Sequence, residues 1–76
     1  MNILETVENI MRDIFDDENL VVSLETTADN IEEWDSLSNM NLIVEIENQF
    51  NIQMSIQDLE SMKSVSDIVQ NIKHKL

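Results

Sequence analysis

Apolar residues recur at spacings of three and four positions in separate segments of this chain, with polar residues between them. This period places the apolar residues on one face of a helix, so it predicts amphipathic helices that pack against one another. The pattern predicts helices over residues 2–16, 36–51 and 65–75, and a capping motif predicts a short helix over residues 56–62. We therefore expect one all-α domain spanning residues 1–76, a small four-helix bundle with a short third helix and a long loop between the first and second helices.

Residues that favour helix ends stand at the expected boundaries. Ser55 precedes Asp58 by three positions and Ser64 precedes Asp67 by three, a spacing typical of the capping box with Asp in place of the usual Glu or Gln. The chain has no glycine, so Asn51 is expected to take the left-handed conformation that ends the second helix.

The segment between the first two predicted helices has no sustained helical period, and its Thr, Asn and Asp residues favour turns. We interpret it as a long loop held against the helices by apolar anchors. The piece "NLVVSL" has the composition of a strand, but no other segment offers it a partner strand. The expected anchors are Leu20, Val22, Leu24, Ile31 and Trp34.

The composition excludes several classes of function. A formal net charge of −12 repels nucleic acid and anionic lipid, so we expect no nucleic-acid or membrane partner and favour basic protein surfaces instead. The absence of cysteine rules out disulfides and thiolate chemistry, which is typical of a reducing cytosol. The start of the chain resembles neither a signal peptide nor a membrane span. We expect a cytoplasmic protein.

Neither catalysis nor metal binding is indicated. A nucleophilic serine requires a base within reach, and the one histidine of the chain, His74, lies near the C-terminal end. The acidic run around the end of the first helix lacks the alternating ligands and central glycine of a calcium loop. We expect no enzyme activity and interpret the run as a solvated helix end; its acids are Asp13, Asp16, Asp17 and Glu18.

The predicted helix 36–51 has two apolar faces. The first is expected to be buried, and it consists of Leu42, Ile43, Ile46 and Phe50. The second lies nearly opposite, with Ser36 at its edge. Either the helix is central and buries both faces, or the second face is exposed for docking and is flanked by acids. The second face consists of Leu37, Met40 and Val44, with Asp35, Glu45 and Glu47 beside it.

From its position alone, we interpret Ser36 as part of a helix cap. Asp and Ser at a helix start are most often N-caps, and either Asp35 or Ser36 can fill that position.

The stretch "EEWDSLSNMNLIVEIENQFNI" resembles the central motif of the acyl carrier protein family, in which Asp-Ser-Leu opens the second helix. The likeness covers essentially the whole chain, because "SIQDLESMKSVSDIV" is similar to the segment that forms the family's short third helix and the start of its fourth. The resemblance implies that Ser36 carries 4′-phosphopantetheine, added from coenzyme A by a phosphopantetheinyl transferase with magnesium. A thioester carrier needs a sulfur, which this chain could obtain only from such a group.

The resemblance also implies the partners, which are the transferase and acyl-loading and acyl-processing enzymes with basic docking surfaces. Their contacts would be Asp35, Leu37, Met40, Val44, Glu45 and Glu47, and the chain would act as a monomer. Ser38 and Asn41 stand where the carriers of fatty acid synthesis commonly have acids. This departure favours a dedicated pathway such as polyketide, nonribosomal peptide or modified-sugar biosynthesis. The alternative is a small acidic helical adaptor, in which Ser36 only caps the second helix and the second face binds a basic partner.

Overall fold

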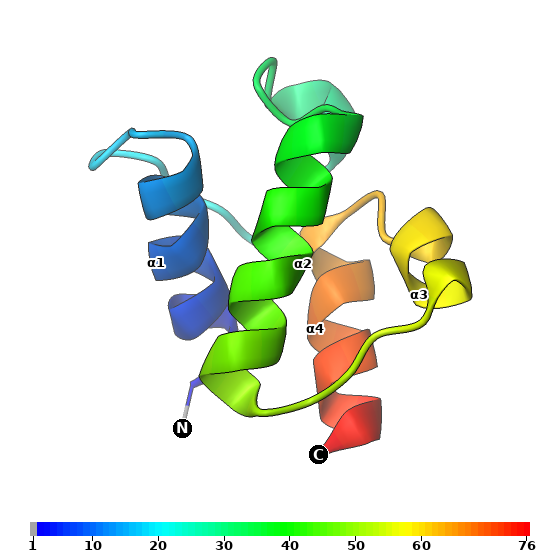
Figure 1. The fold of residues 1–76 in the computed structure, drawn as a ribbon. Coiled ribbons are helices and arrows are strands. Elements are labelled where there is room, and N and C mark those ends of the chain that lie inside the picture. Colours follow the sequence, from blue (N-terminus) through cyan, green and yellow to red (C-terminus); the bar gives the residue numbers. More distant parts are fainter. Residues whose placement is uncertain (1) are drawn as a thin grey trace.

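The computed structural model describes residues 2–76, which form four α-helices and one short 3₁₀ helix (Figure 1). The expected all-α fold with a short third helix and a long first loop is confirmed. No helix within the described residues has both the length and the apolar character needed to cross a bilayer. The elements are α1 (Ile3–Ile14), η1 (Ala28–Asn30), α2 (Ser36–Phe50), α3 (Ile56–Ser61) and α4 (Val65–Lys75).

Residues in the left-handed conformation end the first two long helices. Asn51 has φ 55°, as expected, and the N–H of Ile52 donates to the carbonyl oxygen of Glu47 at 3.2 Å. At the end of α1 the left-handed residue is Asp16, with φ 52°. The following N–H donates back to Arg12 O at 3.0 Å, a Schellman arrangement that ends α1 two residues before the predicted boundary.

The two predicted capping boxes differ in the structure. Ser55 and Asp58 each accept a hydrogen bond from the other's backbone N–H, at 3.1 and 3.0 Å, so this box is confirmed. Ser64 caps α4 by accepting from Asp67 N–H at 3.1 Å. The predicted return bond, from the N–H of Ser64 to the Asp67 carboxylate, is wrong, because this carboxylate accepts from Lys63 N–H at 3.2 Å instead.

The core lies where α1, α2 and α4 face one another and where the long loop covers them. The predicted buried face of α2 is confirmed. On α4, the expected apolar face is buried at Val65, Ile68, Val69 and Ile72, but the expectation for Leu76 is wrong because its side chain is 68% exposed. The buried residues are Val7, Ile10, Met11, Val22, Ile31, Trp34, Leu42, Ile43, Ile46, Phe50, Met62, Val65, Ile68, Val69 and Ile72.

Three of the five predicted loop anchors are buried, namely Val22, Ile31 and Trp34. Leu20 is half-buried, whereas the prediction for Leu24 is wrong because its side chain is 49% exposed. A turn closed by a bond from the N–H of residue 26 to the carbonyl of residue 23, 3.1 Å long, places Leu24 at its outer tip.

Polar contacts complete the attachment of the loop. Glu8 accepts from Val22 N–H at 3.0 Å, and Arg12 donates to Leu20 O at 2.7 Å. Within residues 2–76 the loop forms no strand; its one ladder contact is an isolated bridge between Thr27 and the segment before α4. Main-chain and carboxylate partners therefore satisfy backbone groups of a segment that lacks regular structure.

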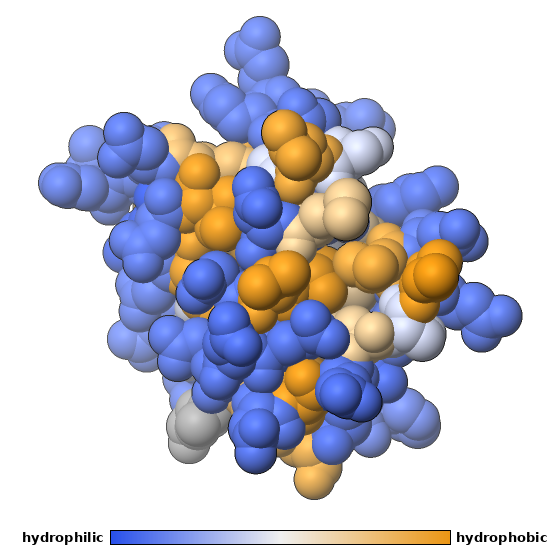
Figure 2. All heavy atoms as spheres, viewed as in Figure 1, coloured by the Kyte–Doolittle hydropathy of each residue, from blue (hydrophilic) through white to orange (hydrophobic). Residues whose placement is uncertain are grey.

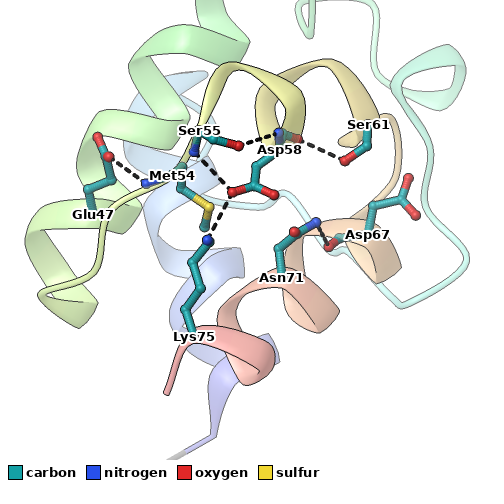
Figure 3. A network of polar contacts seen from close by, with 8 residues as sticks. All are labelled: Glu47, Met54, Ser55, Asp58, Ser61, Asp67, Asn71 and Lys75. Atoms are coloured by element: carbon teal, nitrogen blue, oxygen red, sulfur yellow. Dashed lines mark hydrogen bonds and ion pairs between the residues drawn. The ribbon is translucent and has the colours of Figure 1, made fainter.

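α3 has six residues, too few for a stable helix on its own, and side chains from other elements hold it in place (Figure 3). Lys75 at the end of α4 forms an ion pair with Asp58 at 2.9 Å. Glu47 of α2 accepts from Met54 N–H, just before α3, at 2.9 Å. Met62, which follows α3, is 2% exposed and anchors its C-terminal end in the core.

Replacing Asn51 by glycine is expected to stabilise the fold, because a residue with a Cβ is strained at φ 55°. We expect Asn51→Gly to raise the midpoint of thermal unfolding by about 2–4 °C, equivalent to about 0.5 kcal/mol, as measured by circular dichroism. Asn41→Gly, at an exposed position inside α2, is the matched control and should lower the midpoint. Equal losses in both variants would contradict the assigned role of Asn51.

Candidate functional site

Asp35, and not Ser36, is the N-cap of α2. Its carboxylate accepts from the N–H of Ser38 at 3.0 Å, and the hydroxyl of Ser38 accepts from the N–H of Asp35 at 2.9 Å. This reciprocal pair satisfies two of the groups that a helix start leaves open. The interpretation of Ser36 as a cap is therefore wrong, because Asp35 already fills that role and Ser36 is the first residue inside the helix.

The segment before α2 is fixed to the first turn of that helix. Trp34 is 5% exposed, and its indole Nε1–H donates to the side-chain oxygen of Asn39 at 3.0 Å. The hydroxyl of Ser38 donates to Glu33 O at 2.7 Å. Ser36 thus lies inside a closed capping box that a buried aromatic anchor precedes, so its position is set by contacts on both sides.

Ser36 is exposed, and its hydroxyl forms no hydrogen bond to any of residues 2–76. The polar groups around it are already paired through Asp35 and Ser38. The oxygen is therefore open to an enzyme approaching from solvent, and no internal hydrogen bond has to break before it can react.

A pocket of about 520 Å³ lies beside Ser36, between the start of α2 and α3. Its wall is mostly apolar and its rim carries both signs of charge, from Asp35, Glu60 and Lys63. The apolar lining consists of Ala28, Trp34, Met40, Ile56, Leu59 and Met62. Figure 2 shows apolar atoms gathered over α2 and α3 on this face, bordered by hydrophilic ones.

The second apolar face of α2 is exposed along its length. Leu37, Met40 and Val44 are 71%, 59% and 53% exposed, so the interpretation in which a central helix buries both faces is wrong. Ile56 of α3, which is 73% exposed, lines the Ser36 pocket together with Met40. Sequence reasoning missed Ile56, because two turns of helix are too short to reveal an apolar face by their period.

The three acids predicted to flank this face have different surroundings. Glu45 is exposed. Asp35 is occupied in the cap of α2, and Glu47 is half-buried with one oxygen bound to Met54 N–H at 2.9 Å. Glu47 therefore supports the connection to α3, whatever contact it also makes with a partner.

The histidine considered as a base for a nucleophilic serine does not lie at the Ser36 end of the fold. His74 is exposed in the last turn of α4, and Figure 1 places that end of the chain opposite the start of α2. No cluster of three or more potential metal ligands is found among residues 2–76. The acids near the end of α1 are turned to solvent at Asp13, Asp16, Asp17 and Glu18.

The Asp35 cap predicts a defined pH dependence of stability. The pKa of Asp35 lies below its ordinary value of 3.8, first because the N–H of Ser38 donates to the carboxylate and then because the Ser38 hydroxyl does so. A lowered folded-state pKa gives stability that is present above the unfolded-state pKa and is lost as the pH falls through the folded-state value.

We therefore expect stability in urea to fall as the pH drops below about 4, and Asp35→Asn, a cap that does not titrate, to reduce this loss. Asp29→Asn, at an exposed acid of η1 that takes no part in the cap of α2, is the control and should leave the loss unchanged. If Asp35→Asn and wild type lose the same stability as the pH falls, the ionised Asp35 cap does not contribute to the pH dependence of stability.

Comparisons with known proteins agree with this geometry. The family described as "Phosphopantetheine attachment site" matches residues 5–72. The holo acyl carrier protein from Geobacter metallireducens is 39% identical, with a TM-score of 0.89 over 99% of this chain and 86% of that one. A protein from Mycobacterium tuberculosis assigned as an acyl carrier protein shares the fold at 22% identity, with a TM-score of 0.86 over 96% of this chain and 97% of that one.

The family match extends over most of the chain and includes the exposed serine, its cap and the pocket beside it. Members of this family carry a covalent 4′-phosphopantetheine group and are carriers rather than catalysts. The chain belongs to the acyl carrier protein family.

Proposed function

We propose that Ser36 is the attachment residue and that the chain carries acyl or aminoacyl intermediates as thioesters on the attached arm. The observation that carries this proposal is the exposed, unpaired hydroxyl of Ser36 at the first position of α2. Capping by Asp35 leaves that hydroxyl without a structural task. The sequence Asp35-Ser36-Leu37 also has the order that the family's motif requires.

The space around Ser36 fits an extended arm. The side chain is exposed beside an open pocket with apolar walls, so the arm has space on both its solvent and its protein side. When bound, 4′-phosphopantetheine supplies a terminal thiol, which the polypeptide lacks because it has no cysteine.

Attachment requires a partner enzyme to supply the base. In the transfer, the oxygen of Ser36 forms an ester bond to the pantetheine-bearing phosphorus of coenzyme A, and the bond from that phosphorus to adenosine 3′,5′-bisphosphate breaks. The hydroxyl proton leaves to a base on the transferase, because no side chain among residues 2–76 accepts a hydrogen bond from Ser36. This chain contributes the nucleophilic oxygen and its fixed position on α2.

The exposed face of α2 is the proposed docking surface for enzymes that load and process the cargo. Leu37, Met40 and Val44 supply its apolar centre, and Asp35 and Glu45 supply negative charge nearby. An apolar centre with charged surroundings is typical of protein interfaces. Basic residues on the partner would steer the encounter at low salt.

We further propose a cytosolic carrier of a dedicated pathway and not of general fatty acid synthesis. Ser38 replaces an acid that is common at this position in fatty-acid carriers, and its hydroxyl is committed to the cap of α2. Asn41, which also replaces an acid, is exposed on the same helix. The docking surface therefore presents fewer charges, which fits partners other than those of fatty acid synthesis.

The attachment is tested by mass. Incubation with coenzyme A, magnesium and a broad-specificity phosphopantetheinyl transferase should add about 340 Da, and peptide mapping should locate the addition at Ser36. Ser36→Ala should abolish the gain, with circular dichroism showing that the variant remains folded. Ser66→Ala, at the second position of α4, is the control and should be modified like the wild type. An unmodified wild type would favour the adaptor alternative.

The docking surface is tested by the kinetics of the same transfer. Leu37→Ala should raise KM about tenfold, the effect of removing an apolar interface anchor. Val21→Ala, at a residue that is 75% exposed on the long loop, should leave KM unchanged. Added salt should raise KM for the wild type, since it screens the attraction between opposite charges. Equal effects of Leu37→Ala and Val21→Ala on KM would contradict the proposed docking surface on α2.

A further inference from the structure

We propose that Lys63 positions the arm by pairing with its phosphodiester. This inference rests on the attachment to Ser36 proposed above. It concerns a residue outside the family's Asp-Ser-Leu motif and outside the apolar docking surface of α2.

Lys63 and Ser36 line the same pocket. The backbone of Lys63 is held firmly, because its carbonyl accepts from Ala28 N–H at 2.9 Å and its N–H donates to Asp67 at 3.2 Å. Its side chain is exposed. The start of this side chain is therefore fixed near the attachment serine, and its flexible stem can reach a group bound there.

The Asp35 carboxylate makes the start of α2 a weaker site for the phosphodiester, because it adds a negative charge there. A helix N-terminus attracts anions through its free N–H groups, but the Asp35 carboxylate already accepts from Ser38 N–H at 3.0 Å. Glu60 places a second carboxylate on the pocket rim. A phosphodiester on Ser36 would add a third negative charge, and Lys63 is the one cation among the residues that line this pocket.

The other cations of the described chain are placed elsewhere. Arg12 pairs with Glu8 at 3.2 Å, and Lys75 pairs with Asp58 at 2.9 Å. Lys73 lines a different pocket, formed by the start of α1, the long loop and α4. Each of these three has a position or a partner that separates it from Ser36, which leaves Lys63 for the arm.

The first test compares apo- and holo-protein by NMR of the lysine side chains. Installing the arm should shift the ¹⁵Nζ and ¹³Cε resonances of Lys63 and leave those of Lys73, the matched internal control, in place. The shift of the Lys63 resonances between apo- and holo-protein should vanish at about 1 M salt, where the Debye length is about 3 Å. Unchanged Lys63 resonances, or equal shifts for both lysines, would overturn the proposal.

The second test reads the phosphorus of the holo-protein directly. In the Lys63→Gln variant, the ³¹P resonance should move toward the position that it has in urea-unfolded holo-protein. In the Lys63→Arg variant, which keeps the positive charge, the resonance should stay at the wild-type position. Lys73→Gln should have no effect. A ³¹P resonance insensitive to Lys63→Gln would contradict the pairing.

The two proposals fail in different ways. Without a mass gain at Ser36 no phosphorus signal exists, and the attachment itself is refuted. A normal mass gain with unaffected Lys63 and ³¹P resonances refutes only the role of Lys63.

Discussion

The reciprocal hydrogen bonds between Asp35 and Ser38 are the interaction on which the candidate site depends. They close the start of α2 with the residues on either side of the Ser36-Leu37 pair, so Ser36 enters the helix without having to cap it. A cap made by Ser36 itself would direct its oxygen at the helix backbone. Because Asp35 forms the cap, the Ser36 side chain remains exposed on a rigid element, which suits the attachment proposed for it.

The helices could be predicted because their information is local. Apolar spacing located the three longer helices, and the capping pattern at Ser55 located the short third one. Asn51 located the end of the second helix, since a left-handed residue and a capping serine act on their own neighbours in sequence. The long loop was harder, because contacts with distant segments decide its course. Leu24 is apolar, as an anchor must be, yet a local turn directs its side chain outward. The Asp67 carboxylate accepts from the N–H of Lys63 rather than from the N–H of Ser64.

The candidate site, like the fold, could be predicted from the sequence only in part. The order Asp35-Ser36-Leu37 and the second face of α2 are visible in the sequence, and the fold and the family are confirmed; Ser36 as the attachment residue stays a prediction. The pocket was not foreseeable, because its walls come from α2, α3 and the long loop, and their distances depend on contacts such as Lys75 with Asp58. Glu47 shows what sequence position alone misses. Its position suggests a docking charge, whereas in the structure its carboxylate accepts from Met54 N–H, in the connection before α3.

Trp34 has a consequence for how this protein can be observed. It is the one tryptophan of the chain, it is nearly sealed from water at 5% exposure, and it lines the pocket that Ser36 also lines. Its indole is tied to Asn39 at 3.0 Å, so its emission is sensitive to both the polarity of the pocket and the integrity of the first turn of α2. The molecule thus contains an intrinsic fluorophore two residues from the serine, and events at that serine become visible to a spectrometer without any added label.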